Sequence, residues 1–438
     1  MAPSHPYLPL TPAERKELLK AIGVDSFDQL VEYIPKQALR PRLNLPAALS
    51  EPELSERLAQ LAARNSAAGA NACFLGGGAR YHYIPAVIGA LISRGEFLTS
   101  YTPYQPEVAQ GTLQAGFEFQ SLICDLFNME VANLGMYDGA TAFAEAHLMA
   151  CRITRRSRVA ILDSVDERMV EVLATYTKWQ GIELVRIPAD APDLPADIAS
   201  LGVQSPNFLG GIEDVARLTE AAHKAGALCV THADPVASCM FAPPGDFGVD
   251  IVTAEGQPLG VPLSFGGAYI GLFACKKSHV RQMPGRIAGM TTDSDGQRTF
   301  VLTLQTREQH IRRERATSNI CTSTQLIALM NTIYLALMGP DNMRQLAETC
   351  YHKAHYAAAT LDALKGYTAV RPRTFFNEFV LKCPAPPAEI NRALLEEGVI
   401  GGLDVSNKVP NGMLLCFTEM NSRAQIDRLA QLLERIAR

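Results

Sequence analysis

From residue 158 onward, short runs of aliphatic and β-branched residues alternate with amphipathic helical patterns. We expect strands at 158–162, 183–187, 228–231, 250–253 and 268–274, with helices at 167–178 and 212–225 between them. Alternation of this kind predicts a mostly parallel sheet covered by helices, the α/β class. Ligands bind such sheets at the carboxyl ends of the strands, so the loops there are the candidate site.

The two ends of the chain have other patterns. Residues 1–50 combine a short helical pattern at 12–22 with proline-punctuated segments, which predicts an arm. A break at Gly339-Pro340 precedes helical and strand-like patterns of a compact α+β unit. We therefore expect an N-terminal arm (1–50), a large α/β domain (51–335) and a smaller C-terminal domain (336–438).

Composition excludes several classes of function. Lys and Arg total 40 against 45 Asp and Glu, a net charge of −5 that offers no general attraction to nucleic acid or an anionic membrane. No apolar run reaches the about 18 residues that a membrane span needs, and the N-terminus does not read as a secretory signal. Ten scattered cysteines without a Cys-x-x-Cys pair predict reduced thiols, no metal site and a cytoplasmic location.

Most catalytic signatures are absent, and one glycine-containing loop leaves two interpretations open. The sequence has no P-loop and no nucleophile elbow, and Gly76-Gly77-Gly78 favours a tight bend over a dinucleotide-binding turn. Asp138-Gly139-Ala140-Thr141 precedes a helical pattern. Its backbone N–H groups could hold an anion, or Asp138 could simply cap the helix.

Two further segments could be contact surfaces. Residues 306–315 are rich in arginine and glutamate, which is typical of an ion-paired solvated face. They lead into small hydroxyl and amide side chains at 316–322, which would suit contact with a phosphate or a partner chain. Residues 101–107 form a loop stiffened by two prolines, whose two tyrosines either make contacts at the surface or are buried.

These segments resemble a known family. The strings YTPYQPEVAQGTLQ (101–114), PLGVPLSFGGAYIG (258–271) and LTLQTREQHIRRERATSNICT (302–322) are similar to the glycine cleavage system P-protein, the decarboxylating glycine dehydrogenase. The resemblance is strongest to its N-terminal half, which many prokaryotes make as a separate chain, subunit 1. It implies the fold-type I architecture of pyridoxal-phosphate enzymes.

The resemblance also shows a departure from the catalytic pattern. Residues 250–260, where such folds carry the lysine that forms a Schiff base with the cofactor, contain no lysine, and Gln257 stands about where the catalytic half has it. A carboxamide cannot form an imine, since its nitrogen lone pair is delocalised into the carbonyl. The resemblance thus implies that this chain binds no cofactor covalently and that pyridoxal 5'-phosphate belongs to a partner, subunit 2.

The implied function is that of an enzyme subunit without a catalytic residue of its own. With subunit 2, in an α2β2 heterotetramer, it would decarboxylate glycine and pass the aminomethyl group to the lipoyl group of H-protein. Two alternatives remain open: an autonomous pyridoxal-phosphate enzyme that uses Lys276 or Lys277, and a structural subunit that docks H-protein.

The resemblance implies roles for two sets of residues. Ten would face the partner's active site or the interface: Tyr101, Thr102, Tyr104, Gln105, Arg307, Arg312, Arg313, Thr317, Ser318 and Asn319. The second set, Asp138, Gly139, Ala140 and Thr141, would be the relic of a phosphate-binding loop.

Overall fold

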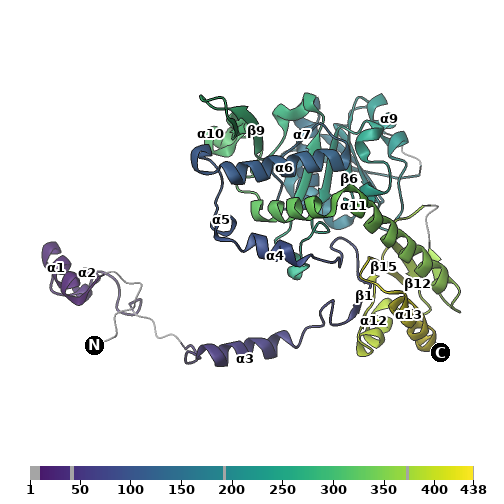
Figure 1. The fold of residues 1–438 in the computed structure, drawn as a ribbon, viewed down its shortest axis with the longest axis horizontal. Coiled ribbons are helices and arrows are strands. Elements are labelled where there is room, and N and C mark those ends of the chain that lie inside the picture. The colour runs from purple at the N-terminus through teal and green to yellow at the C-terminus, as the bar shows by residue number, and fades with distance from the viewer. Residues whose placement is uncertain (1–9, 40–43, 191–193, 371–373, 438) are drawn as a thin grey trace. The chain divides into compact units, whose positions relative to one another are not determined.

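The computed structural model describes residues 10–39, 44–190, 194–370 and 374–437 (Figure 1). It divides into two units, Met1–Asn65 and Ser66–Arg438, which are described separately. The domain boundaries expected after residues 50 and 335 remain predictions. Within the described ranges, no helix combines the length and the apolarity that crossing a membrane requires.

The first unit contains three helices, each preceded by a Ser or Thr at the N-cap position: α1 (Pro12–Ile22), α2 (Phe27–Leu30) and α3 (Glu51–Ala62). Thr11 and Ser50 each form a capping box, with Glu14 and Glu53 respectively, and a proline occupies the first turn of α1 and of α3. No residue of these three helices is buried.

A seven-stranded sheet organises the second unit. Its order is β2-β8-β7-β6-β5-β3-β4. The strands are β2 (Val131–Ala132), β3 (Arg158–Leu162), β4 (Glu183–Ile187), β5 (Ser200–Ser205), β6 (Leu228–Ala233), β7 (Ile251–Glu255) and β8 (Gly271–Cys275). β7, β6, β5, β3 and β4 run parallel, whereas β8 is antiparallel to both of its neighbours. The expected mostly parallel α/β sheet is confirmed.

The helices that precede or connect these strands are α4 (Ala86–Ile92), α5 (Gly95–Leu98), α6 (Gln110–Phe127), α7 (Gly139–Thr154), α8 (Glu167–Thr177) and α9 (Val215–Lys224). Of these, α6, α7 and α9 pack directly on the sheet, and α8 packs on α7. α7 packs against β5, β6, β7 and β8. Its alanines at 142, 144, 146 and 150 are buried, so the helix can approach the strands closely. The start of α7 is thereby held beside the carboxyl ends of β6 and β7.

A hairpin that the sequence patterns did not predict follows the sheet. β9 (Ile287–Thr292) pairs antiparallel with β10 (Arg298–Thr303), and both strands pack against α6. After it come the short turns η6 (Gln305–Arg307), α10 (Gln309–Arg312) and η7 (Arg313–Arg315). The hairpin therefore carries the arginine-rich segment.

The C-terminal region is built on a second sheet, β11-β12-β15-β14, which is antiparallel throughout. Its elements are β11 (Thr368–Val370), β12 (Glu378–Lys382), α12 (Pro387–Glu396), β14 (Leu403–Asp404), β15 (Gly412–Cys416) and α13 (Arg423–Ile436). Beside it, β1 (Ala72–Cys73) pairs with β13 (Val399–Ile400). The long α11 (Gln325–Asp362) runs from the first sheet to the second (Figure 1), with a non-helical residue at Gly339, where a break was expected.

Candidate functional site

A cavity of about 500 Å³ lies at the carboxyl ends of the parallel strands, where the topology predicts a ligand site. Gln204 of β5, His232 of β6 and Glu255 of β7 line it, together with Gly139 at the start of α7. The loop 77–80 and Glu378 of the C-terminal sheet also line it.

Gln257, two residues beyond β7, is buried and fixed by the backbone around it. Its Nε2 donates to the carbonyl of Arg80 at 3.0 Å and to that of Val261 at 2.9 Å, while its Oε1 accepts from the Arg80 N–H at 2.9 Å. All three contacts need a carboxamide, because one group must both donate and accept. The side chain therefore serves as a structural clamp on the loop that carries Arg80.

The start of α7 is occupied by groups of the chain itself. Asp138 accepts from the Thr141 N–H at 2.8 Å, so it caps the helix, one of the two interpretations left open. The Glu255 Oε2 accepts from the Gly139 N–H at 2.9 Å, in the position that an anion at this helix start would take. Burial raises the pKa of Glu255 to about 7, although three backbone N–H groups oppose the shift.

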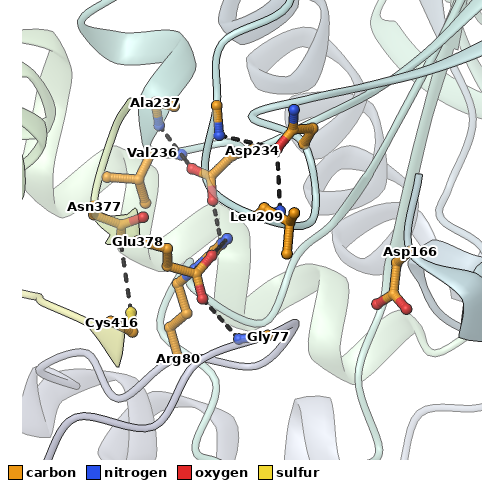
Figure 2. Close-up of polar contacts among 12 residues, drawn as sticks. Gly77, Arg80, Asp166, Leu209, Asp234, Val236, Ala237, Asn377, Glu378 and Cys416 are labelled. Carbon is orange, nitrogen blue, oxygen red and sulfur yellow. Dashed lines mark hydrogen bonds and ion pairs between the residues drawn. The ribbon is translucent and has the colours of Figure 1, made fainter. Parts of the chain in front are cut away.

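Arg80 lies between two carboxylates at the cavity wall, as Figure 2 shows. It forms an ion pair with Asp234, whose other oxygen accepts from the backbone of Val236 and Ala237, and it donates to the Glu378 Oε2 at 2.6 Å. Glu378 also accepts from the Gly77 N–H at 2.7 Å, inside the expected glycine bend. Burial alone would lower the pKa of Arg80, but the two carboxylates raise it above its ordinary value.

Sequence reasoning missed Arg80 because its partners lie 154 and 298 residues away along the chain. No local pattern links a single arginine to carboxylates at such separations. The glycine triplet just before it was the one available signal: a side chain at Gly76 would collide with Glu378, so the bend keeps the backbone close to this carboxylate.

The lining of this cavity does not fit a covalently held pyridoxal phosphate. Five carboxylates line it, those of Asp138, Asp166, Asp234, Glu255 and Glu378, against the two guanidinium groups of Arg80 and Arg168. Such a balance disfavours the cofactor's phosphate, and the Glu255 carboxylate already takes the N–H group at the start of α7. Gln257 offers no amine.

The tyrosine loop and the arginine-rich segment are brought together by a residue that sequence reasoning had not singled out. Arg286 is buried, donates to the Tyr104 hydroxyl at 2.5 Å and lies over the Tyr104 ring. The Tyr104 ring also makes an edge contact with the His310 ring, at a centroid distance of 5.1 Å. Tyr101, which is exposed, and Thr102 line a second cavity of about 360 Å³ with Thr322, Ser323 and Thr324.

The expected residues of the second segment have different surroundings. Arg307 is buried, and its guanidinium donates to the carbonyls of Met283 and Gly285, so it supports the turn that leads into β9. Thr317 donates its N–H to the Arg307 carbonyl at 3.0 Å. Ser318 donates to the Glu145 carboxyl at 2.8 Å. The remaining members of the expected set, Gln105, Arg312, Arg313 and Asn319, are exposed.

The two lysines considered as alternative cofactor attachment sites lie elsewhere. The Lys276 Nζ donates to Asp250 at 2.6 Å and to the Gly248 carbonyl at 2.7 Å. Asp250 precedes β7, so this ion pair lies at the amino end of that strand, whereas the 500 Å³ cavity lies at its carboxyl end. Lys277 follows it and is exposed.

One group of possible metal ligands occurs outside these cavities. The ligand atoms of His82, Cys350 and Glu419 all lie within 4.8 Å of one another. The His82 Nδ1 donates to Glu419 at 2.8 Å, which satisfies that carboxylate oxygen without an ion. The expectation of no metal site stays a prediction.

Comparison with known proteins identifies the family. A family model described as glycine cleavage system P-protein matches residues 5–433. The chain belongs to the glycine cleavage system P-protein family. A relative from Thermomicrobium roseum, named probable glycine dehydrogenase (decarboxylating) subunit 1, is 46% identical over 443 residues, which cover 98% of each chain. The family resemblance expected from the sequence is confirmed.

Solved structures agree with this assignment. A glycine decarboxylase (P-protein) of the glycine cleavage system, crystallised with an inhibitor, matches with a TM-score of 0.93 and 43% identity, covering 99% of this chain and 100% of its own. A glutamate decarboxylase from Lactobacillus brevis matches with a TM-score of 0.66 at 13% identity, covering 90% and 94%, and bears on the fold alone. This P-protein family member therefore has the expected fold-type I architecture.

Proposed function

We propose that this chain is the subunit of a decarboxylating glycine dehydrogenase that lacks the cofactor lysine, subunit 1. The observation that carries the proposal is Gln257: in a chain that matches the P-protein family along nearly its whole length, the expected lysine position holds a carboxamide bound to the Arg80 backbone. The Glu255 carboxylate at the start of α7 adds support, because it competes with a cofactor phosphate.

In this proposal the cofactor and the reacting groups belong to subunit 2, and the two chains form an α2β2 heterotetramer in the cytoplasm. Pyridoxal phosphate, bound by the partner, would accept the electrons released when the glycine carboxylate leaves as carbon dioxide. The aminomethyl group would pass to the lipoyl group of H-protein. The ten cysteines of this chain, all free thiols, fit a reducing compartment.

In this proposal the chain contributes a surface that lies against the active site of subunit 2. The residues 101–105 and 307–319 would face the partner's active site. In support, Tyr104 contacts both Arg286 and His310, so the two segments lie next to each other. Arg307 fixes the turn before β9 from within. Thr317, Ser318 and Asn319 would then approach the partner's cofactor phosphate or the rim of its site.

The decisive experiment is exchange of glycine with bicarbonate by purified subunit 2, with lipoylated H-protein, in the presence and absence of this chain. We expect activity to require both chains, and this chain alone to show no imine absorbance after incubation with pyridoxal phosphate. Full activity of subunit 2 alone at saturating H-protein would overturn the proposal in favour of a docking role. An imine band in the isolated chain would overturn it in favour of an autonomous enzyme.

The contribution of the 307–319 segment has its own test. A Thr317→Ala, Ser318→Ala double variant should lower the exchange rate of the complex or its affinity for the cofactor. Thr175→Ala, on the exposed side of α8, removes a comparable hydroxyl and should leave both unchanged. Unchanged turnover and cofactor affinity in the double variant would remove this segment from the partner's site.

A further inference from the structure

A third cavity, of about 360 Å³, is lined by arginines from five separate elements. They come from α7, from η5 (Lys277–Gln282), from η6, from α10 and from η7: Arg152, Arg281, Arg307, Arg312 and Arg315. The hydroxyl-bearing Thr306 and Thr317 and the amide of Gln282 also line it. None of the described residues that line this arginine cavity is acidic.

The carboxylates nearby do not balance these five positive charges. Glu308 lies 3.5 Å from the Arg307 guanidinium, Glu314 lies 3.8 Å from that of Arg315, and Glu145 interacts electrostatically with Arg152. Burial raises the pKa of Glu308 and of Glu145. Even with all three ionised, the cavity keeps a surplus of two positive charges.

Two of the guanidinium groups also have unused donors. The Nε atoms of Arg152 and Arg307 are buried and have no hydrogen-bond partner. Arg307 as a whole is 7% exposed. Their other nitrogens donate to backbone carbonyls of Gln282, Met283 and Gly285, so both groups are already fixed in place. These Nε atoms have almost no accessible surface. The two fixed guanidinium groups therefore contribute charge to the cavity wall, and an anion would accept hydrogen bonds from the exposed side chains of Arg281, Arg312 and Arg315.

We propose that the arginine cavity binds a small, free, phosphate-bearing polyanion. Guanidinium groups converging from five elements suit a compact ligand with several charges, since one carboxylate would neutralise only one of them. The acidic 500 Å³ cavity is unsuited to the same ligand. The site shares Arg307, Arg312 and Thr317 with the segment proposed to face subunit 2. It goes beyond that proposed role because its ligand is neither glycine nor the cofactor.

Isothermal titration of the full chain with inorganic pyrophosphate at constant ionic strength tests the site. We expect saturable binding that is stronger than for inorganic phosphate and absent for acetate. Arg315→Gln and Arg281→Gln, both at exposed positions, should each weaken pyrophosphate binding about tenfold. Arg217→Gln on α9 removes the same charge from a distant surface and should have no effect. No saturable binding, or equal weakening by the Arg217→Gln control, would overturn the proposal.

Two further measurements test whether the arginine cavity is the binding site and whether it stays open in the complex. Arg152→Gln reaches the deeper wall of the cavity, and circular dichroism would establish that this variant is folded before its loss of pyrophosphate binding counts in support. The same titration of the purified complex with subunit 2 should retain binding. Loss of binding in the complex would assign the cavity to the subunit interface and overturn a site for a free ligand.

Discussion

The Glu255 carboxyl occupies the start of α7, where an external anion could otherwise bind. Its oxygens accept from the N–H groups of Gly139, Gln257 and Ile270, so it joins the start of α7 to the loops after β7 and before β8. An external anion would have to displace a group already held by three backbone donors. The loop 138–141 thus serves the internal cohesion of the fold.

The raised pKa of Glu255, about 7, predicts a pH dependence of stability. A carboxyl whose pKa is higher in the folded than in the unfolded chain binds more protons when folded, so its contribution is complete below its unfolded pKa and is lost as pH rises through 7. For Glu255 the loss would be at most about 3 kcal/mol. In Glu255→Gln, urea unfolding between pH 4.5 and 7 should show a flatter decline in the free energy of unfolding than in the wild type. Parallel pH profiles would contradict this assignment.

For single residues, the sequence predicted chemical reactivity better than it predicted contacts between side chains. The identity of Gln257 is enough to exclude an imine, because reactivity depends on the residue type alone. Its clamp on Arg80 could not be predicted, since the two residues are 177 positions apart. The same holds for Arg286 and Tyr104, 182 positions apart, which no local pattern connects.

The first residue of α7, Gly139, has little room for a side chain. A Cβ at Gly139 would lie 2.9 Å from the His232 ring and 3.1 Å from the Glu255 Cα. Gly139→Ala should therefore destabilise the chain by about 1–3 kcal/mol, through overpacking against β7.

The matched control for this prediction is Gly95→Ala. Gly95 is likewise the first residue of a helix, α5, but a Cβ there would meet nothing within 4 Å. Guanidinium unfolding of both variants measures the difference. Equal stability of the two would show that the start of α7 yields easily to a methyl group.

Elements with a strong local signal were predicted well. β3 and β4 occupy the expected residues. β5 was missed because its Gly202 and terminal serines weaken the apolar run, although the strand is central and paired on both sides. The β9–β10 hairpin was missed because its outer half is exposed and polar, so tertiary packing on α6 defines it.

For the whole molecule, Arg80 links three distant parts of the second unit: the loop after β1, the end of β6 and the start of β12. Arg80→Ala would leave Asp234 and Glu378 buried without their counter-charge, and should lower the free energy of unfolding by about 3–5 kcal/mol. Arg158→Ala removes an arginine from a largely exposed ion-pair group and should change stability only slightly. Chemical denaturation compares the two; equal losses would deny Arg80 a special role.

The division into two units predicts the effect of truncation. Removal of residues 1–65 leaves both sheets and their buried clusters intact, so the shortened chain should unfold in one cooperative step with an unchanged midpoint. Removal of residues 1–80 also deletes β1 and Arg80 and should lower that midpoint. Thermal unfolding followed by circular dichroism distinguishes the two. A lower midpoint for the shorter deletion would show that the first unit supports the second.

The pairing of β1 with β13 has a consequence for biosynthesis. Ala72 and Cys73 leave the ribosome long before Val399 and Ile400, and Arg80 likewise emerges ahead of Glu378. During most of translation this early segment has no strand to join and no carboxylate from β12 to meet. The closure of this region is therefore a late event, completed only when nearly the entire polypeptide has been made, and until then its unpaired backbone depends on solvent or a chaperone.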